Sequence, residues 1–203
     1  MKIYESLEQG TQEWLKVRLG KFTASNCYTI GTEGMGKGRG GLETLCLEKA
    51  SEILTQTLPE TYTNEDIERG HQLEQEARSA YELETGKQVK QVGFVEVNEF
   101  VGCSPDGFVE DDGLIEIKCK NDKNHLLCLL GKDIDKSYQW QMQMQMYCTG
   151  RKWVDFVSYN PNFQKTPLKI IRVERNEEMQ KALDIGLEKG IARVKEILAE
   201  VEK

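Results

Sequence analysis

The feature that most constrains the fold of this chain is a short stretch that carries two carboxylates and one amine. Ser104-Pro105-Asp106 is followed, after nine residues, by Glu116-Ile117-Lys118. Asp111-Asp112-Gly113 lies between them, and aspartate and glycine tolerate the positive φ angles that tight hairpin turns require. The stretch therefore predicts two extended segments, 107–110 and 114–120, joined by a turn.

Alternation in the second segment brings the charged side chains together. Side chains on a strand point to alternate faces, so Glu116 and Lys118 share one face and the other is apolar. The preceding strand can deliver Asp106 beside them. Paired carboxylates suit Mg²⁺, and a lysine beside such an ion can orient or help deprotonate water and offset charge on a phosphoryl transition state. A hairpin whose charges only face solvent is the alternative that residue chemistry leaves open.

Length and composition predict one globular domain, residues 1–203, with no need for stabilising cross-links. No segment approaches the roughly 20 apolar residues of a membrane helix, and Met1–Glu5 lacks the apolar core of a signal peptide. We therefore expect a cytosolic protein. The six cysteines are dispersed without a Cys-x-x-Cys pair, which argues against a zinc ribbon and predicts buried, reduced thiols.

The net charge of −7 argues against a nucleic-acid partner unless the charge is unevenly distributed. Between Glu60 and Glu84 there are eight acidic residues against two arginines, which nearly accounts for the whole excess. Residues 1–41 instead carry six basic residues against four acidic ones. A locally basic surface is therefore compatible with this acidic chain.

Periodicity and capping residues predict the remaining elements. Strands are expected at 88–97, 153–159 and 168–173. Helices are expected at 11–19, from Thr23 or Ser25 onward, and at 42–56, 64–84, 124–130 and 176–201. Six of the eleven residues in 31–41 are glycine, which predicts a mobile loop without the Gly-Lys-Ser/Thr ending of a P-loop.

Residues 137–149 are ambiguous. Gln139–Met146 alternates with a period of two, which favours a strand. Glutamine and methionine are nevertheless good helix formers, Ser137 can cap a helix, and Gly150 can end it. We therefore predict a helix, on which Tyr138, Gln141, Met142 and Gln145 share a face.

Four segments in order give the chain a resemblance to a known family. The Ser104-Pro105-Asp106…Glu116-Ile117-Lys118 stretch is the PD-(D/E)xK nuclease signature. Three further segments complete the set: Trp14–Gly20 with Thr23-Ala24-Ser25, Arg69–Glu74 with Ala77-Arg78, and Tyr138 with Gln141 and Gln143. Together these segments resemble the lambda-exonuclease-type (YqaJ-like, alkaline exonuclease) branch.

The resemblance implies a restriction-endonuclease-like α/β core, with a central mixed β-sheet flanked by helices. It also implies a Mg²⁺-dependent 5′→3′ exonuclease, with Mn²⁺ as a substitute ion. Such enzymes degrade one strand of linear double-stranded DNA from a phosphorylated 5′ end, release mononucleotides and leave a 3′ tail. Family members form homotrimeric rings and act with a single-strand annealing protein in recombination. A phage or prophage protein in the bacterial cytoplasm is implied.

The resemblance also assigns roles to individual residues. The metal ligands would be the carboxylates of Glu74, Asp106 and Glu116 with the Ile117 backbone carbonyl, and Lys118 would position and activate water. The pocket for the terminal 5′ phosphate and DNA would be formed by Arg18, Ser25, Ser104, Tyr138 and Gln141.

Each assignment has a structural alternative. Glu74 could be a solvated helix residue, Arg18 an ion-pair partner, Ser25 a helix cap and Tyr138 a packing residue.

Two other functions compete with this one. A structure-specific endonuclease can use the same core, and a non-catalytic recombination scaffold can share the fold. The scaffold is expected to lack one of the carboxylates or the lysine, and all four are present. A Cas4-like or RecB-like nuclease is disfavoured because the chain has no four-cysteine cluster. The glycine-rich segment falls where family members grip and open DNA.

Overall fold

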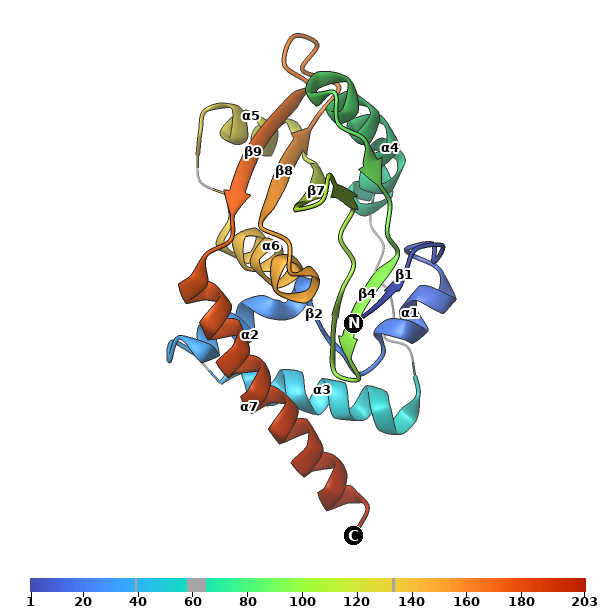
Figure 1. Ribbon diagram of the computed structural model, residues 1–203, viewed down its shortest axis with the longest axis vertical. Helices are drawn as coiled ribbons and strands as arrows, with labels where there is room; N and C mark the ends of the chain where they lie inside the picture. Colours follow the sequence, from blue (N-terminus) through green and yellow to red (C-terminus); the bar gives the residue numbers. More distant parts are fainter. Residues whose placement is uncertain (39, 58–64, 133) are drawn as a thin grey trace.

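The structure is a computed structural model that describes residues 1–38, 40–57, 65–132 and 134–203, without the side chains of 65–71. Within these residues the strands form two sheets (Figure 1). The four-stranded sheet has the order β1 (Lys2–Tyr4), β4 (Phe94–Asn98), β5 (Val101–Cys103) and β2 (Phe22–Thr23). The five-stranded sheet has the order β3 (Val89–Lys90), β6 (Gly107–Val109), β7 (Gly113–Cys119), β8 (Trp153–Tyr159) and β9 (Leu168–Glu174).

The five-stranded sheet is mixed, and β7 lies at its centre. β7 and β8 are parallel, from Gly113 opposite Trp153 to Cys119 opposite Tyr159. The chain connects them through α5 (Asp122–Leu129) and α6 (Lys136–Thr149), as a parallel crossover requires. The other neighbours in this sheet are antiparallel. These observations confirm the predicted fold class, a mixed sheet flanked by helices.

Both faces of β7 are covered, which agrees with the predicted alternation. Leu114 belongs to the larger apolar cluster, which also contains Met142 of α6. Ile115 and Ile117 belong to a second cluster, where α4 (Glu65–Thr85) packs on the opposite face of the sheet. A helix on each side therefore holds in place the strand that carries Glu116 and Lys118.

A second layer is helical. α7 (Glu177–Val201), which Asn176 caps as predicted, packs along α2 (Cys27–Gly34) and α3 (Gly41–Thr55). Figure 1 shows the C-terminal part of α7 extending past α3. The N-terminal segment adds α1 (Gln12–Arg18), which Thr11 caps and which lies near β1 in Figure 1.

The prediction of a mobile loop over 31–41 is wrong in its first part, because residues 31–34 are the end of α2. A Cβ at Gly34 would lie 1.7 Å from the backbone oxygen of Ala182, and one at Gly31 would lie 2.3 Å from the Trp140 ring. These two glycines allow other helices to pack closely against α2, so they serve contact rather than flexibility.

Two details around the hairpin differ from the prediction. The expected strand over 88–97 is divided, because β3 and β4 belong to different sheets and the chain crosses between them at residues 91–93. The positive φ of the turn belongs to Glu110 (φ 50°), whereas Gly113 is the first residue of β7. Gly113 is required for a different reason, since the Trp153 ring lies where a Cβ would be.

Two helix starts also differ. Thr23 caps a short 3₁₀ turn (Ala24–Asn26), and α2 begins after it at Cys27. α6 is a helix as predicted, but Asp135 caps it, by accepting the Ser137 N–H, instead of Ser137. The predicted cap Asn64 lies outside the described residues.

Five of the cysteines in the described part are buried thiols, in agreement with the prediction. No helix in that part combines the length and the apolarity needed to cross a membrane.

Candidate active site

Asp106 lies on the loop between β5 and β6 and closes the end of the hairpin. Its Oδ2 accepts the Ile117 N–H at 2.6 Å. β6 pairs with β7 only as far as Gly107 opposite Ile115, so the Asp106 side chain takes the place of a strand partner at Ile117. The N–H and C=O of one strand residue point toward the same edge. The Ile117 carbonyl is therefore directed to the side where Asp106 lies.

Glu116 is the most buried of the three predicted carboxylates, with a side chain only 1% exposed. Gln141 and Gln145 of α6 donate to its two oxygens at 2.7 Å and 2.6 Å. The Lys118 ammonium lies 2.5 Å from Oε1. A buried charge is tolerated when it is paired and hydrogen-bonded, and these three donors meet that condition.

Lys118 is a cation in this setting. Burial lowers its pKa, but the nearby carboxylates of Glu116 and Asp106 outweigh this effect, so the pKa is raised above its usual range. The Lys118 ammonium also lies 5.2 Å from the centre of the Tyr138 ring. At neutral pH the side chain can donate hydrogen bonds and offset negative charge, and it is poorly suited to accept a proton.

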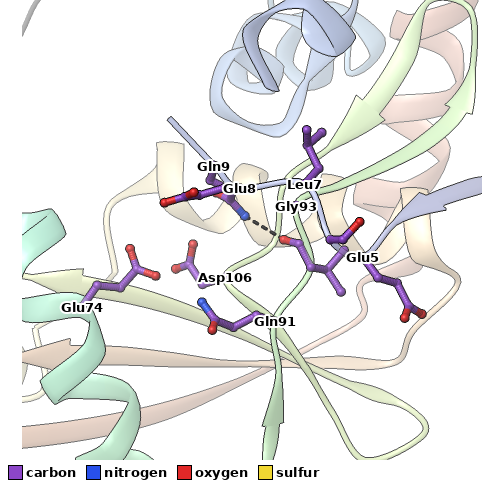
Figure 2. Close-up of a pocket in the computed structure, with 10 residues that line it drawn as sticks. Glu5, Leu7, Glu8, Gln9, Glu74, Gln91, Gly93 and Asp106 are labelled. Atoms are coloured by element: carbon purple, nitrogen blue, oxygen red, sulfur yellow. Dashed lines mark hydrogen bonds between the residues drawn. The ribbon is translucent and has the colours of Figure 1, made fainter. Parts of the chain in front are cut away.

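Glu74 reaches the same region from α4, and its side chain is 33% exposed. Glu74 and Asp106 both line a pocket of about 440 Å³, into which their carboxylates project (Figure 2). Burial, then the charges of Glu116 and Glu74, raise the pKa of Asp106 well above its ordinary value, despite the opposing effect of Lys118. The carboxylates are therefore close enough for the charges of Glu116 and Glu74 to oppose the ionisation of Asp106.

The donor atoms of this pocket decide whether it can hold a cation. Among the described residues, no three acidic, histidine or cysteine side chains are arranged as a ready-made metal cluster. Glu116, whose oxygens are occupied by glutamine and lysine donors, is not part of the pocket lining. Glu74 and Asp106 remain, and Mg²⁺ is commonly held by one or two carboxylates together with water and substrate phosphate. These two carboxylates, which line the pocket, fit such an ion.

Arg18, at the end of α1, forms a second cluster with hydroxyl groups. Its guanidinium donates to Ser104 Oγ at 3.1 Å and to the hydroxyls of Ser25 and Thr23, each at 3.4 Å. It lies 4.1 Å from the Trp14 ring centre. The structure thus brings together Arg18, Ser25 and Ser104, which were predicted to share a pocket.

The charge of Arg18 is not neutralised by an ion pair within the described part of the chain. Burial lowers the pKa of Arg18 to about 10, so the guanidinium is still charged at neutral pH. Its hydrogen-bond partners are neutral hydroxyls, and arginine with hydroxyl donors is a suitable arrangement for a phosphate. Trp14, whose Nε1 donates to Ser104 Oγ at 2.9 Å, and Thr23 were not predicted as site residues. Both lie within the motifs that carried the family resemblance.

The two predicted residues of α6, Gln141 and Tyr138, contact Glu116 and Lys118 rather than the Arg18 cluster. Gln141 binds Glu116, and Tyr138 packs on Phe156 with ring centres 5.8 Å apart while facing Lys118 and Lys120. Gln145 was not predicted as a site residue, although it lies one helical turn after Gln141.

Gln143, quoted with the α6 motif, belongs to the opposite side of the helix. It donates to the Glu174 carbonyl and accepts from the Asn176 N–H. The i, i+4 spacing of Gln141 and Gln145 was the available signal for the residues that hold Glu116.

Comparisons with known proteins were made on the sequence and on the structure. Residues 13–152 match the family model of the YqaJ-like viral recombinase domain. The fold is similar to an alkaline exonuclease (LHK-Exo) from Laribacter hongkongensis, with a TM-score of 0.85, 33% identity and coverage of 95% of this chain and 96% of that one. A structure of LHK-Exo in complex with dAMP gives 0.83 and 34%, with the same coverage of 95% and 96%.

A phage-related exonuclease from Haemophilus somnus 129PT shares the fold, with a TM-score of 0.71, 18% identity and coverage of 89% of this chain and 96% of that one. No curated protein matches the sequence.

Proposed function

Because this chain belongs to the YqaJ-like viral recombinase family, we propose that it is a divalent-metal-dependent exonuclease acting on linear double-stranded DNA. It would degrade one strand in the 5′→3′ direction from a phosphorylated end. The family prediction is confirmed, and LHK-Exo, an alkaline exonuclease, supports the hydrolytic activity. That enzyme has been crystallised with dAMP, which supports a nucleoside monophosphate as the product here.

One observation carries the proposal for a phosphorylated end. Ser104 belongs to the Arg18 cluster and Asp106 to the carboxylate pocket, and they are two residues apart on one loop. Two residues of extended chain span at most about 7 Å. A terminal phosphate bound by Arg18 would therefore leave the next phosphodiester of the same strand near the carboxylates.

The residues divide the chemistry between them. Glu74 and Asp106, with the Ile117 carbonyl, would hold the divalent cation, and Mn²⁺ could replace Mg²⁺. When bound, such an ion polarises a phosphoryl oxygen and lowers the pKa of coordinated water. Lys118 would donate to the attacking water and offset charge on the phosphoryl group, while Glu116 holds the Lys118 ammonium in position.

The end-binding pocket has a separate task. Arg18, with the Ser25 and Ser104 hydroxyls, would grip the terminal phosphate and orient the strand, and Tyr138 would line the substrate path beside Lys118. Gln141 would act through Glu116 rather than on the phosphate.

Assembly and partners follow from the family. We propose a homotrimeric ring around DNA, acting as one domain per chain over residues 1–203. It would supply 3′ single-stranded tails to a single-strand annealing protein in the bacterial cytoplasm. A ring retains its substrate after each cut, which raises the effective concentration of the DNA end.

Digestion of matched DNA ends tests the proposal. Linear duplex with a 5′ phosphate should release mononucleotides with Mg²⁺ present, and the same duplex with a 5′ hydroxyl should react more slowly. Arg18→Ala should reduce the preference about 10- to 150-fold, because a hydrogen bond to a charged group contributes about 1.5–3 kcal/mol. Lys16→Ala on the same helix is the control.

Two results would contradict the assignment. Equal rates on duplexes with a 5′ phosphate and with a 5′ hydroxyl in the unmodified protein would contradict the assignment of the phosphate pocket. Cleavage of covalently closed plasmid would favour the structure-specific endonuclease, because an exonuclease requires a free end.

A further inference from the structure

Directly behind Glu74, α4 carries an arginine that the proposed reaction does not use. Arg78 is one helical turn after Glu74, is only 5% exposed, and donates from Nη2 to Glu74 Oε1 at 2.6 Å. Burying an arginine is costly unless its donors are satisfied. We therefore expect hydrogen-bond partners around its guanidinium.

Arg78 is held by partners on two sides. Nη1 donates to Gln75 Oε1 at 2.8 Å. Gln91, on the crossing between β3 and β4, places its amide oxygen 3.0 Å and 3.1 Å from the two terminal nitrogens in the orientation that satisfies its hydrogen bonds. Gln91 lines the same pocket as Glu74 and Asp106 (Figure 2). The guanidinium is therefore fixed between the helix and the pocket wall.

The geometry has a direct consequence for Glu74. Arg78 occupies one carboxylate oxygen, which leaves the other for the pocket. Glu74 is one-third exposed, and without this contact its side chain could sample rotamers that point into solvent. The positive charge of Arg78 also lies close to a pocket whose carboxylates repel one another. Arg78 thus restricts the orientation of the Glu74 side chain. Its positive charge also reduces the electrostatic repulsion between Glu74 and Asp106.

We propose that Arg78 is a positioning residue that aims the Glu74 carboxylate into the pocket with Asp106, and that it thereby sets the affinity of the pocket for a divalent cation. The identity of the ligand, though not the arrangement, rests on the proposed function. Gln91 assists by fixing the guanidinium. Residues that orient a metal-binding side chain typically change metal affinity 10- to 100-fold when they are replaced.

Cation binding without DNA tests this inference. Titration calorimetry with Mg²⁺ alone, and the Mg²⁺-dependent rise of the melting temperature, should show about 10- to 100-fold weaker binding in Arg78→Met. Arg78→Lys keeps the charge but loses the hydrogen bonds that the guanidinium makes on two sides. Its Mg²⁺ affinity should therefore lie between that of Arg78→Met and that of the unmodified protein. Arg193→Met removes a partly exposed arginine that pairs with Glu43 and Glu196 instead, and should bind Mg²⁺ as the unmodified protein does.

Each outcome bears on the proposal. Unchanged Mg²⁺ affinity in a folded Arg78→Met variant would overturn it, and folding is checked by circular dichroism. If that variant does not fold, unchanged affinity in Arg78→Lys would overturn it equally, and so would an unmodified protein that binds no cation.

The nuclease proposal fails separately. A protein that binds Mg²⁺ through an Arg78-dependent site but does not degrade duplex DNA would contradict only the function.

Discussion

Glu116 and Glu74 are both carboxylates of the candidate site, but the fold supports them in different ways. Glu116 is on the central strand, is 1% exposed and has donors from two glutamines and one lysine. Glu74 is on a helix, is 33% exposed and is held by Arg78. The sheet side of the site is built into the core, whereas the helix side depends on a local contact.

The difference follows from where each element is anchored. β7 pairs with β8 over its full length and is covered on both faces. α4 is anchored by the buried Tyr81, whose hydroxyl donates to Asp155 at 2.7 Å, while Arg172 binds the same carboxylate through two nitrogens. Glu74 lies two turns before this anchor. The site therefore combines a part fixed by the core with a part that can adjust to its ligand.

The largest effect is expected on the sheet side, at Lys118. Lys118→Met should lower the single-turnover rate about 10²- to 10⁴-fold, because it removes the donor to water and the charge that offsets the transition state. Binding of duplex DNA, measured by anisotropy with Ca²⁺, should change little. Lys123→Met, an exposed lysine at the start of α5, serves as the control. A fully active Lys118→Met protein would remove this lysine from the mechanism.

A direct comparison of the two glutamates should separate fold from function. Gln145→Leu leaves one oxygen of Glu116 buried without its glutamine donor, which should cost about 1–3 kcal/mol of unfolding free energy. Glu74→Gln keeps an oxygen that can accept from the Arg78 guanidinium at a one-third exposed position, so it should lower the unfolding free energy by less than Gln145→Leu does, yet weaken Mg²⁺ binding. Urea denaturation and calorimetry measure the two quantities. Equal losses of stability would contradict the contrast between the two sides.

The smallest effect is expected in the pH dependence of the cation-free protein. Burial, then the charge of Glu116, raise the pKa of Asp106 above its ordinary value of 3.8, so the folded state binds that proton more tightly than the unfolded chain does. Stability should therefore decrease as pH rises from about 4 through the raised pKa. Asp106→Asn removes this dependence and can still accept the Ile117 N–H. Its melting temperature in EDTA should exceed that of the unmodified protein by a margin that grows with pH. A difference in melting temperature that is the same at every pH would contradict this expectation.

Much of the sheet side could be predicted from the sequence, because a strand encodes its two faces directly. The alternation of 114–118 placed Glu116 and Lys118 together, and the structure has this arrangement. The predicted start and end of α7 at Asn176 and Val201 also agree, since a cap and an amphipathic period are local properties.

The rest depended on contacts that a single sequence does not specify. Gly31 and Gly34 were taken for a loop because glycine is equally compatible with flexibility and with close packing, and only the neighbouring helices decide. The helical period placed Gln145 on the face of Gln141, but only the packing of α6 shows that this face binds Glu116 while Gln143 contacts the Glu174 carbonyl. The role of Arg78 required the position of Gln91, which comes from a segment that crosses between two sheets.

The short link from Ser104 to Asp106 has a consequence for how far the enzyme would advance in each cycle. Gln9 braces this link by donating to the Pro105 carbonyl at 3.0 Å and to the Val92 carbonyl at 2.8 Å. Under the proposed function, the loop would fix the distance between the bound terminal phosphate and the scissile bond. Because two peptide units set its length, each step would remove one nucleotide whatever the base.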